Sequence, residues 1–280
     1  MAGITGVGTV SSMPITDTGP PDARATDSPK SINQTVASTP PGLILRDLRL
    51  DYDGQPLLFI AHEIIAGGRT TCLLGPSGVG KTSLLRAIAG LLKPASGTVT
   101  ATDRQPLTDR LAYMPQSDCL MPWLSVLQNV VLGKRLRGER ITAVDRERAE
   151  FLLRQVGLAD KARRLPNTLS GGEKQRTALA RVLFEDRAIV LMDEPFSALD
   201  AITRSALQAL GAELLAGRTV ILITHDPLEA IRLSHDIRIL SGHPARLGTA
   251  ITLDGAPPRS SDSAAIWQHH EQLMTALQTS

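Results

Sequence analysis

The segment GPSGVGKT, from Gly75 to Thr82, restricts the possible folds of this chain more than any other feature. It follows a short apolar run, TTCLL at 70–74, and precedes KTSLLRAIAGLL at 81–92, which has the pattern of a helix. The motif G-x-x-x-x-G-K-[ST] between a strand and a helix is the phosphate-binding loop, or P-loop, of nucleotide-binding proteins. A glycine-rich turn without a ligand is the alternative, but the strand, the complete motif and the helix together favour a phosphate site.

The chemistry of the P-loop comes from its main chain and from two side chains. Glycines allow successive N–H groups to turn toward phosphate oxygens, and the helix N-terminus adds partial positive charge. Lys81 is expected to reach the β- and γ-phosphates, and Thr82 is expected to ligate Mg²⁺. The predicted nucleotide-binding set is Gly75, Pro76, Ser77, Gly78, Val79, Gly80, Lys81, Thr82 and Ser83.

Two later apolar runs, AIVLM at 188–192 and VILI at 220–223, predict strands of a parallel sheet that is covered on both faces. A helical stretch between them, 201–216, supplies the crossover that parallel strands require. The first run leads into Asp193 and Glu194, at the edge of the sheet where ligands bind in open α/β folds. Asp193 is expected to orient Mg²⁺ through water, and Glu194 to act as general base on the attacking water. The alternative is an acidic strand end that exits into solvent.

Two other side chains follow predicted strands. Gln116, in AYMPQ, is placed to contact Mg²⁺ or the attacking water. His225, at the end of LITH, could hydrogen-bond both the γ-phosphate and Glu194 as a neutral imidazole. In isolation either residue would be interpreted as a bystander.

The N-terminal part of the domain is predicted to contain antiparallel strands. Apolar and polar residues alternate in LILRDLRL at 43–50 and in LLFIAHEI at 57–64, and a turn separates the two segments. A mostly helical stretch lies at about 117–185, where Ala149, Leu152, Leu153 and Val156 recur at helical spacing. The predicted fold class is therefore α/β: a RecA-like P-loop NTPase core of parallel strands, an N-terminal antiparallel β subdomain and a helical insertion.

Composition limits the remaining function classes. A net charge of +2 and an aromatic content of 3% argue against nucleic acid as a partner. No apolar stretch is long enough to span a bilayer, and the two cysteines indicate neither a disulfide framework nor a metal site, so we expect a soluble protein of a reducing compartment. Residues 1–42 are rich in Pro, Gly, Ser and Thr and are predicted to form a disordered tail. Residues 258–280 are predicted to include a short amphipathic helix with Ile266, Leu273 and Leu277 on one side.

The segment LSGGEKQR at 169–176 poses a separate question. Ser170 and Glu173 fit a capping box at the start of a helix, but a cap does not require Gly171 and Gly172. Glycine in a helical turn is unfavourable by about 1 kcal/mol relative to alanine. Another constraint must therefore act on these two positions.

The ordered motifs GPSGVGKT, Gln116, LSGG, LMDEP (191–195), SALD (197–200) and His225 resemble those of the ATP-binding cassette family, and specifically the nucleotide-binding subunit of an ABC transporter. The resemblance covers roughly residues 43–250. It implies an ATPase with ATP and Mg²⁺ as ligands, working as a homodimer. In this family the LSGG segment binds the γ-phosphate of ATP held by the opposite subunit, and glycines without side chains allow that approach.

The same resemblance assigns roles to individual positions. Ser170, Gly171 and Gly172 would contact the nucleotide of the opposite subunit, and Asp200 would face that subunit's P-loop. Tyr52 matches the aromatic residue that stacks on adenine, although an exposed tyrosine at a strand end is the alternative. These positions complete the predicted nucleotide-binding set.

The resemblance also implies partners and a location. In this family the region that corresponds to the apolar segment 117–130 receives a coupling helix of a separate transmembrane permease, so Trp123 and Leu124 would lie at the docking surface. The alternative is that these two side chains belong to the subdomain's own core. MPWLSVLQNV and LSGHPARL look like the branch that imports nitrate, alkanesulfonates, taurine or hydroxymethylpyrimidine-type precursors with a periplasmic or lipoprotein solute-binding protein. The subunit would lie peripherally on the cytoplasmic face of the inner membrane.

Three other classes compete with an importer subunit. A soluble ABC ATPase of DNA repair or translation would carry coiled-coil insertions, zinc ligands or two cassettes, and none is visible here. A P-loop GTPase or kinase would leave LSGGEKQR unexplained, and the guanine motif N-K-x-D does not occur. An ABC exporter subunit stays open, although exporters more often fuse the cassette to a membrane domain. The transported solute is not encoded in this subunit.

Overall fold

An antiparallel sheet forms the N-terminal part of the domain. The structure is a computed structural model that describes residues 39–260 and 264–278. In it β1 (Leu43–Tyr52) pairs with β2 (Gln55–Ile65) on one side and with β4 (Ser96–Ala101) on the other. Asp53 and Gly54 turn the β1–β2 hairpin with positive φ angles of 48° and 75°, the geometry that tight hairpins favour. The predicted antiparallel strands of this part are confirmed.

A second sheet carries the parallel strands. Its order is β10-β8-β3-β7-β6-β5, and β9 pairs with β8. The five strands from β8 to β5 are parallel, which places the ends of β3, β7 and β6 side by side at one edge. The bounds are β3 (Thr70–Leu74), β5 (Leu111–Met114), β6 (Ile189–Asp193), β7 (Thr219–Ile223), β8 (Asp236–Ser241), β9 (Arg246–Leu247) and β10 (Ile251–Thr252).

The parallel sheet separates two hydrophobic cores. Along β6, Ile189 and Leu191 belong to one core and Val190 and Met192 to the other. Strand side chains point alternately to opposite faces, so an unbroken apolar run means that both faces are covered. The apolar runs in β6 and β7 are continuous because both faces of the sheet are covered, as the sequence predicted. The predicted α/β P-loop architecture is confirmed.

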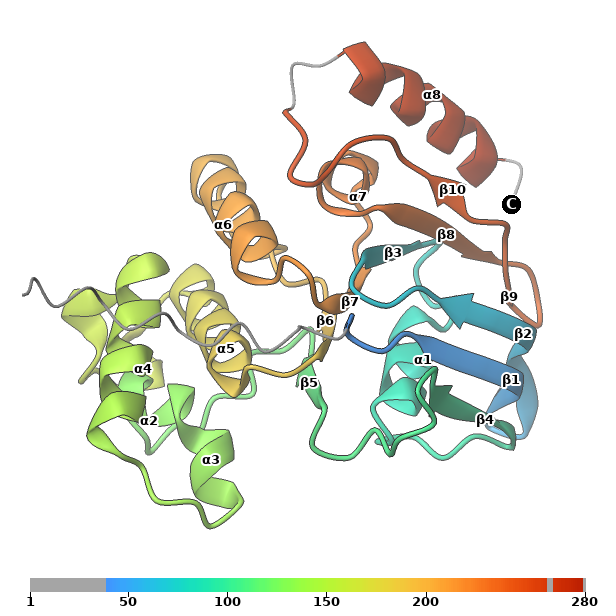
Figure 1. Cartoon of the computed structure of the whole chain (residues 1–280). Coiled ribbons are helices and arrows are strands. Elements are labelled where there is room, and N and C mark those ends of the chain that lie inside the picture. The colour runs from blue at the N-terminus through green and yellow to red at the C-terminus, as the bar shows by residue number, and fades with distance from the viewer. Residues whose placement is uncertain (1–38, 261–263, 279–280) are drawn as a thin grey trace, which may run out of the picture. The chain divides into compact units, whose positions relative to one another are not determined.

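Four helices flank the parallel strands: α1 (Lys81–Ile88), α6 (Ala201–Leu214), α7 (Pro227–Leu233) and α8 (Ala264–Gln278). The helix expected over 81–92 ends at Ile88, because the chain turns at Gly90 with a φ of +72°. The expected C-terminal amphipathic helix is described from Ala264 to Gln278, and it packs on α7 with Ile266 and Leu273 buried (Figure 1).

The predicted helical insertion contains α2 (Val126–Val130), α3 (Leu132–Leu136), α4 (Ala143–Gln155), two short 3₁₀ turns (Ala159–Lys161 and Pro166–Thr168) and α5 (Gly171–Glu185). α2, α3 and α4 all contact α5, and Figure 1 shows these helices grouped beside it. The residues predicted to recur at helical spacing, Ala149, Leu152, Leu153 and Val156, are all buried there. Among the helices of this insertion, only α5 leads directly into a strand of the parallel sheet, β6.

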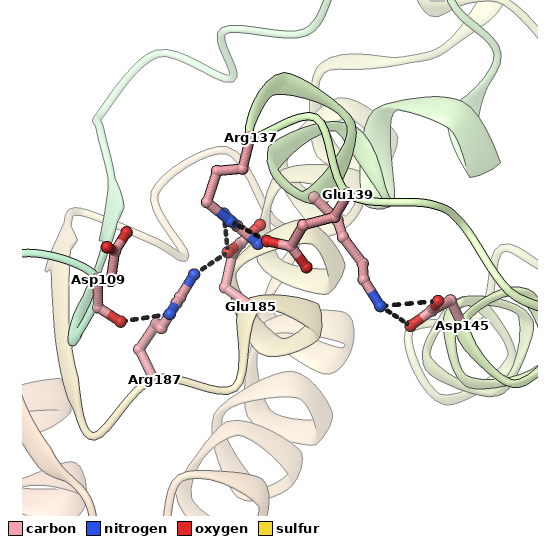
Figure 2. A network of polar contacts seen from close by, with 7 residues as sticks. Asp109, Arg137, Glu139, Asp145, Glu185 and Arg187 are labelled. Atoms are coloured by element: carbon pink, nitrogen blue, oxygen red, sulfur yellow. Dashed lines mark hydrogen bonds and ion pairs between the residues drawn. The ribbon is translucent and has the colours of Figure 1, made fainter.

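A polar network ties the end of α5 to its surroundings (Figure 2). Glu185 accepts from Arg137 Nη1 at 2.7 Å and pairs with Arg187 at 3.4 Å, while Arg187 also donates to the main-chain oxygen of Asp109. A side chain at Gly133 would collide with the Glu185 carboxylate, so glycine allows α3 to approach α5 this closely. The network joins the helical insertion to the loop that leads into β5.

Residues 39–42 correct the predicted boundary of the tail. Thr219 Oγ1 donates to Pro41 O at 2.8 Å in a buried contact, and Gly42 N donates to Thr102 Oγ1 at 2.9 Å. These four residues therefore belong to the folded domain, whereas the prediction for residues 1–38 falls outside the described part of the chain. Within residues 39–260 and 264–278, no helix combines the length and the apolar character needed to cross a bilayer.

Candidate nucleotide-binding and hydrolysis site

The P-loop joins the end of β3 to the start of α1. Gly75, Gly78 and Gly80 all have positive φ, at 150°, 80° and 105°, so the loop curls in a way that side chains would oppose. Lys81 is 8% exposed, and its Nζ donates to Gly75 O and Pro76 O, both at 2.8 Å. Burial lowers the pKa of Lys81, and the carboxylates of Glu194 and Asp193 oppose that shift.

The P-loop glycines have different roles. A Cβ at Gly75 would lie 2.2 Å from Leu240 O, so this glycine is required where the loop presses against the end of β8. A Cβ at Gly78 would meet nothing within 4 Å, and this glycine faces open space. The sequence analysis attributed all of them to phosphate, but the structure gives Gly75 a packing role within the chain as well.

Asp193 is the residue best suited to hold a divalent cation. It ends β6 and is 1% exposed, and its Oδ2 has no hydrogen-bond partner among the described residues. Burial raises the pKa of Asp193; a hydrogen bond from Thr82 lowers it, Glu194 raises it, and Arg86 and Lys81 lower it. A buried carboxylate oxygen without a partner, beside a threonine hydroxyl, fits Mg²⁺, which prefers oxygen ligands. Thr82 and Asp193 would therefore hold the ion, with Gln116 nearby.

Glu194 occupies a strained position directly after β6. Its φ is +49°, which is unfavourable for a residue with a side chain, and such strain concentrates at functional sites. Gln116 Nε2 donates to Glu194 Oε2 at 3.3 Å, and His225 Nδ1 lies 3.3 Å from Glu194 Oε1. The two residues that follow β5 and β7 thus hold the carboxylate that follows β6. The expectation that His225 contacts Glu194 agrees with this distance.

One cavity of about 250 Å³ is lined by half of the predicted site residues, and Gly75, Pro76, Val79 and His225 are not among them. Because β3, β6 and β7 end at the same edge of the sheet, residues far apart in the sequence meet there. The cavity is lined by Ser77, Gly78, Gly80, Lys81, Thr82, Ser83, Gln116, Asp193, Glu194 and Ile223. It therefore brings together residues predicted to bind phosphate, to hold the cation and to act as the base.

The LSGG segment is not part of that cavity. Ser170 caps α5, accepting from Glu173 N at 3.3 Å and donating its own N–H to Glu173 Oε2 at 2.8 Å, which confirms the predicted capping box. A Cβ at Gly171 would meet nothing within 4 Å, whereas one at Gly172 would lie 3.3 Å from Ala198 O. Gly171 thus faces open space, and Gly172 has an additional packing reason within its own chain.

Two other predicted residues also lie outside the cavity. Asp200 caps α6 by accepting from Thr203 N at 3.0 Å, and that hydrogen bond lowers the pKa of Asp200. Tyr52 is 69% exposed at the end of β1, so it contacts no other part of the predicted site within the chain. Its surface position suits a stacking partner from solution, and the exposed-tyrosine alternative stays open.

Sequence reasoning missed a buried glutamine that connects the two parts of the site. Gln175 is 6% exposed on α5, its Nε2 donates to Glu194 O at 3.0 Å, and its Oε1 accepts from Ala198 N at 2.9 Å. It lies within LSGGEKQR, but nothing in that pattern distinguishes a buried polar position from an exposed one. Only the tertiary contact reveals it.

The loop before α2 is organised by a second missed residue. Asn129 is fully buried; its Oδ1 accepts from Met121 N at 2.8 Å, and its Nδ2 donates to Leu124 O at 3.0 Å. Trp123 is 71% exposed, while Leu124 is half-buried. Trp123 therefore does not belong to the subdomain's own core, whereas Leu124 is partly covered by it.

Comparison with known proteins decides the family. The family model described as ABC transporter matches residues 62–197. An uncharacterized ABC transporter ATP-binding protein of Haemophilus influenzae is 41% identical over 236 residues, covering 83% of this chain and 97% of that protein. The chain belongs to the ABC transporter family as an ATP-binding protein. The expected ABC-type ATPase and its P-loop fold are confirmed at this level.

Other relatives of this ABC protein carry more specific names. The aliphatic sulfonates import ATP-binding proteins of Burkholderia cenocepacia and Rhodococcus jostii are 40% and 42% identical to it, covering 89% and 78% of the chain and 92% and 87% of their own lengths. A solved dimeric ATP-binding cassette, in a post-hydrolysis state bound to ADP and Pi, matches 76% of this chain and 99% of its own, with a TM-score of 0.68 and 30% identity. This structural relative therefore binds a nucleotide.

Proposed function

We propose that this ABC protein hydrolyses ATP to drive a bacterial importer of a small solute, and that the solute is an organosulfonate or a similar anion. The observation that carries the hydrolytic part is the single cavity in which Lys81, Thr82, Asp193 and Glu194 converge. The names of the sulfonate-import relatives support the solute class. The sequence also predicted nitrate, taurine and pyrimidine precursors as possible solutes of this branch, and the binding experiment below distinguishes among the candidate solutes.

Each residue of the cavity has a distinct task in this reaction. The P-loop N–H groups and the Lys81 ammonium bind the β- and γ-phosphates and neutralise the charge that develops there. Thr82 and Asp193 hold Mg²⁺, which as a Lewis acid polarises the phosphoryl oxygens when bound. Glu194 accepts the proton of the attacking water, and the contacts from Gln116 and His225 fix the direction of its carboxylate.

Hydrolysis in this proposal requires a second copy of the chain. Ser170 caps α5 and Gly171 begins it outside the cavity, and no described residue would lie within 4 Å of a Cβ at Gly171, so both positions suit the γ-phosphate bound by a partner. Asp200, at the N-cap of α6, would face the partner's P-loop. The dimeric state named for solved relatives supports this arrangement.

The proposed importer also needs a permease and a solute-binding protein as separate chains. The loop that presents Trp123 is the proposed docking surface for the permease, because an exposed tryptophan surrounded by partly buried apolar side chains favours an interface. The subunit would then work at the cytoplasmic face of the cell membrane, bound through its partners.

The test uses the full chain with Glu194→Gln, which keeps the shape of the side chain and removes its basicity. We expect ATP binding to persist, turnover to fall by about a thousandfold, and a nucleotide-trapped complex to form. Membranes of the native host, solubilised with ATP, should yield a permease and a solute-binding protein with the tagged variant. Hydrolysis near the wild-type rate would refute the assignment of Glu194, and recovery without a membrane protein would refute transport. Titration of the recovered binding protein with sulfonates, nitrate and taurine identifies the solute class.

A further inference from the structure

A small cavity shares Glu194 with the larger cavity, and no P-loop residue lines it. Its volume is about 20 Å³. A polar cavity of roughly 10–15 Å³ already holds one water molecule when two to four polar groups surround it. Every residue in its wall is polar: Glu194, Ser197, Arg204, Thr224, His225, Asp226 and Glu229. The site therefore suits one buried water.

Two residues of this wall carry buried polar atoms that lack a partner among the described residues. These atoms are Glu229 Oε1 and Arg204 Nε, and Glu229 is only 6% exposed. Arg204 uses Nη2 to donate to Leu199 O at 3.0 Å, which leaves its Nε–H unsatisfied. A buried polar atom without a partner destabilises a fold by about 1–3 kcal/mol. One atom accepts and the other donates, so a single water can satisfy both.

Helix capping does not account for Glu229. It is the third residue of α7, where a carboxylate often turns back to the N-cap N–H. Here Asp226 N donates instead to Thr224 Oγ1 at 3.1 Å, and Asp226 Oδ1 accepts from Leu228 N at 2.9 Å and from Glu229 N at 3.3 Å. The helix is capped without the Glu229 carboxyl, whose buried position needs another explanation.

The charges around Glu229 favour its protonated form near neutral pH. The pKa of Glu229 is raised to about 7, mainly by burial; Asp226 and Glu194 also raise it, while Arg204 and a hydrogen bond with Thr224 lower it. The carboxyl therefore changes charge in the pH range in which an enzyme works, in the wall of the same cavity as the proposed base Glu194.

The remaining neighbours are a thiol, two apolar side chains and an arginine that is hydrogen-bonded elsewhere. From β3, the buried Cys72 thiol interacts with Glu229, and burial raises the pKa of Cys72 well above its usual value. From α8, Ile266 and Trp267 line an outer cavity that Glu229 also borders, together with Arg232 of α7, whose Nη1 donates to Gln208 Oε1 at 2.9 Å. Arg204 is thus the cation that acts most directly on this carboxyl.

We propose that Glu229 is a positioning residue for Glu194 and His225, and that it acts through one water held in the small cavity with Arg204. The proposal rests on the hydrolytic function given above. The water accepts from Arg204 Nε–H and donates to Glu229 Oε1, which leaves its second O–H available to the Glu194 side. Ionisation of Glu229 places a second negative charge beside Glu194 and draws Arg204 away from this arrangement, so turnover falls as pH rises.

The experiment compares three variants of the full chain by MgATP turnover, nucleotide affinity and thermal unfolding. Glu229→Gln keeps the shape and hydrogen-bonding groups but cannot ionise, Glu229→Leu removes the polar contact, and Glu213→Gln changes an exposed carboxylate as control. We expect Glu229→Leu to lower kcat about tenfold or more while the nucleotide Kd stays within about twofold, because only the positioning of the base is affected.

The pH profile separates positioning from a purely structural role. Wild-type kcat should fall between about pH 6 and 8, and Glu229→Gln should lose that fall, because only the wild type carries the Glu229 carboxyl. Identical profiles for wild type and Glu229→Gln, or an unchanged kcat in a folded Glu229→Leu, would overturn the proposal. An inactive wild type would instead refute the proposed function itself.

Discussion

The side-chain nitrogen of Gln175 donates to the main-chain oxygen of Glu194 at 3.0 Å. Gln175 belongs to the first turns of α5, and Glu194 is the proposed base at the end of β6. Since the start of α5 is proposed to serve a partner's nucleotide while Glu194 serves its own, this hydrogen bond connects groups of two different composite sites. The same glutamine also donates to Ser197 Oγ at 3.3 Å.

Replacing Gln175 with methionine should therefore uncouple α5 from Glu194 while filling the same space. The variant loses two donated hydrogen bonds and one accepted bond, so we expect a loss of unfolding free energy of about 1–3 kcal/mol. Turnover should fall by about tenfold or more, since the backbone of the base is no longer fixed, and ATP binding should persist. Steady-state ATPase assays below the unfolding temperature measure this, with the exposed Gln155→Met as control. Unchanged turnover in Gln175→Met would show that the connection is only structural.

Ser170→Arg should block ATP-dependent dimerisation and leave nucleotide binding to the monomer nearly intact. The arginine projects from the N-terminus of α5 into the space where a partner's phosphate would approach, while the cavity of the same chain does not include this position. Ser170→Asn is the matched variant, because asparagine also caps helices. Sedimentation analysis in the Glu194→Gln background, with and without ATP, distinguishes the two. A large loss of monomer affinity would place LSGG at the nucleotide of its own chain.

Asn129→Ala should detach the loop that carries Trp123. The change leaves the main-chain groups of Met121 and Leu124 without their buried partner, and we expect a loss of about 2–3 kcal/mol in unfolding free energy. Co-purification of the permease should decrease while ATP affinity is retained. Trp123→Ala should weaken the same association with little change in stability, because the side chain is exposed. Full permease recovery with both variants would contradict a docking role for this loop.

Glu229 should make stability depend on pH in a direction opposite to that of most carboxyls. Its pKa is raised in the folded state to about 7, so the folded protein holds this proton more tightly than the unfolded chain does. The stabilisation is fully present below the unfolded-state pKa of about 4.5, and it is lost as pH rises through about 7. Urea unfolding at pH 5 and pH 8 should show a loss in wild type that exceeds the loss in Glu229→Gln by up to about 3 kcal/mol. Equal losses in both proteins would refute the buried proton.

The predicted site residues that the structure brings to one edge are those at strand ends. Gly75 follows β3, Asp193 ends β6 and His225 follows β7, and parallel neighbours bring those ends together without further information. The apolar runs of β6 and β7 also predicted coverage on both faces, which the two cores confirm. The local cap at Ser170 was equally accessible, since this residue caps α5 as its spacing from Glu173 indicated.

The parts that the sequence could not predict are buried polar side chains with distant partners. Gln175, Asn129 and Glu229 occupy helices whose patterns do not distinguish an inward polar residue from an outward one. Their roles depend on which segment lies opposite, and that is decided by tertiary packing. The early end of α1 and the folding of residues 39–42 onto the domain depend on packing in the same way.

The close approach of Gly75 to Leu240 O has a consequence for any survey of tolerated substitutions in this loop. Alanine at position 75 would fail because the β3 and β8 ends could no longer meet, and alanine at position 78 would fail through strain at its positive φ or through lost access to the ligand. A scan that scores only survival would record both positions as equally intolerant. Intolerance of a glycine here therefore reports architecture as readily as ligand chemistry, and a binding readout is needed to distinguish them.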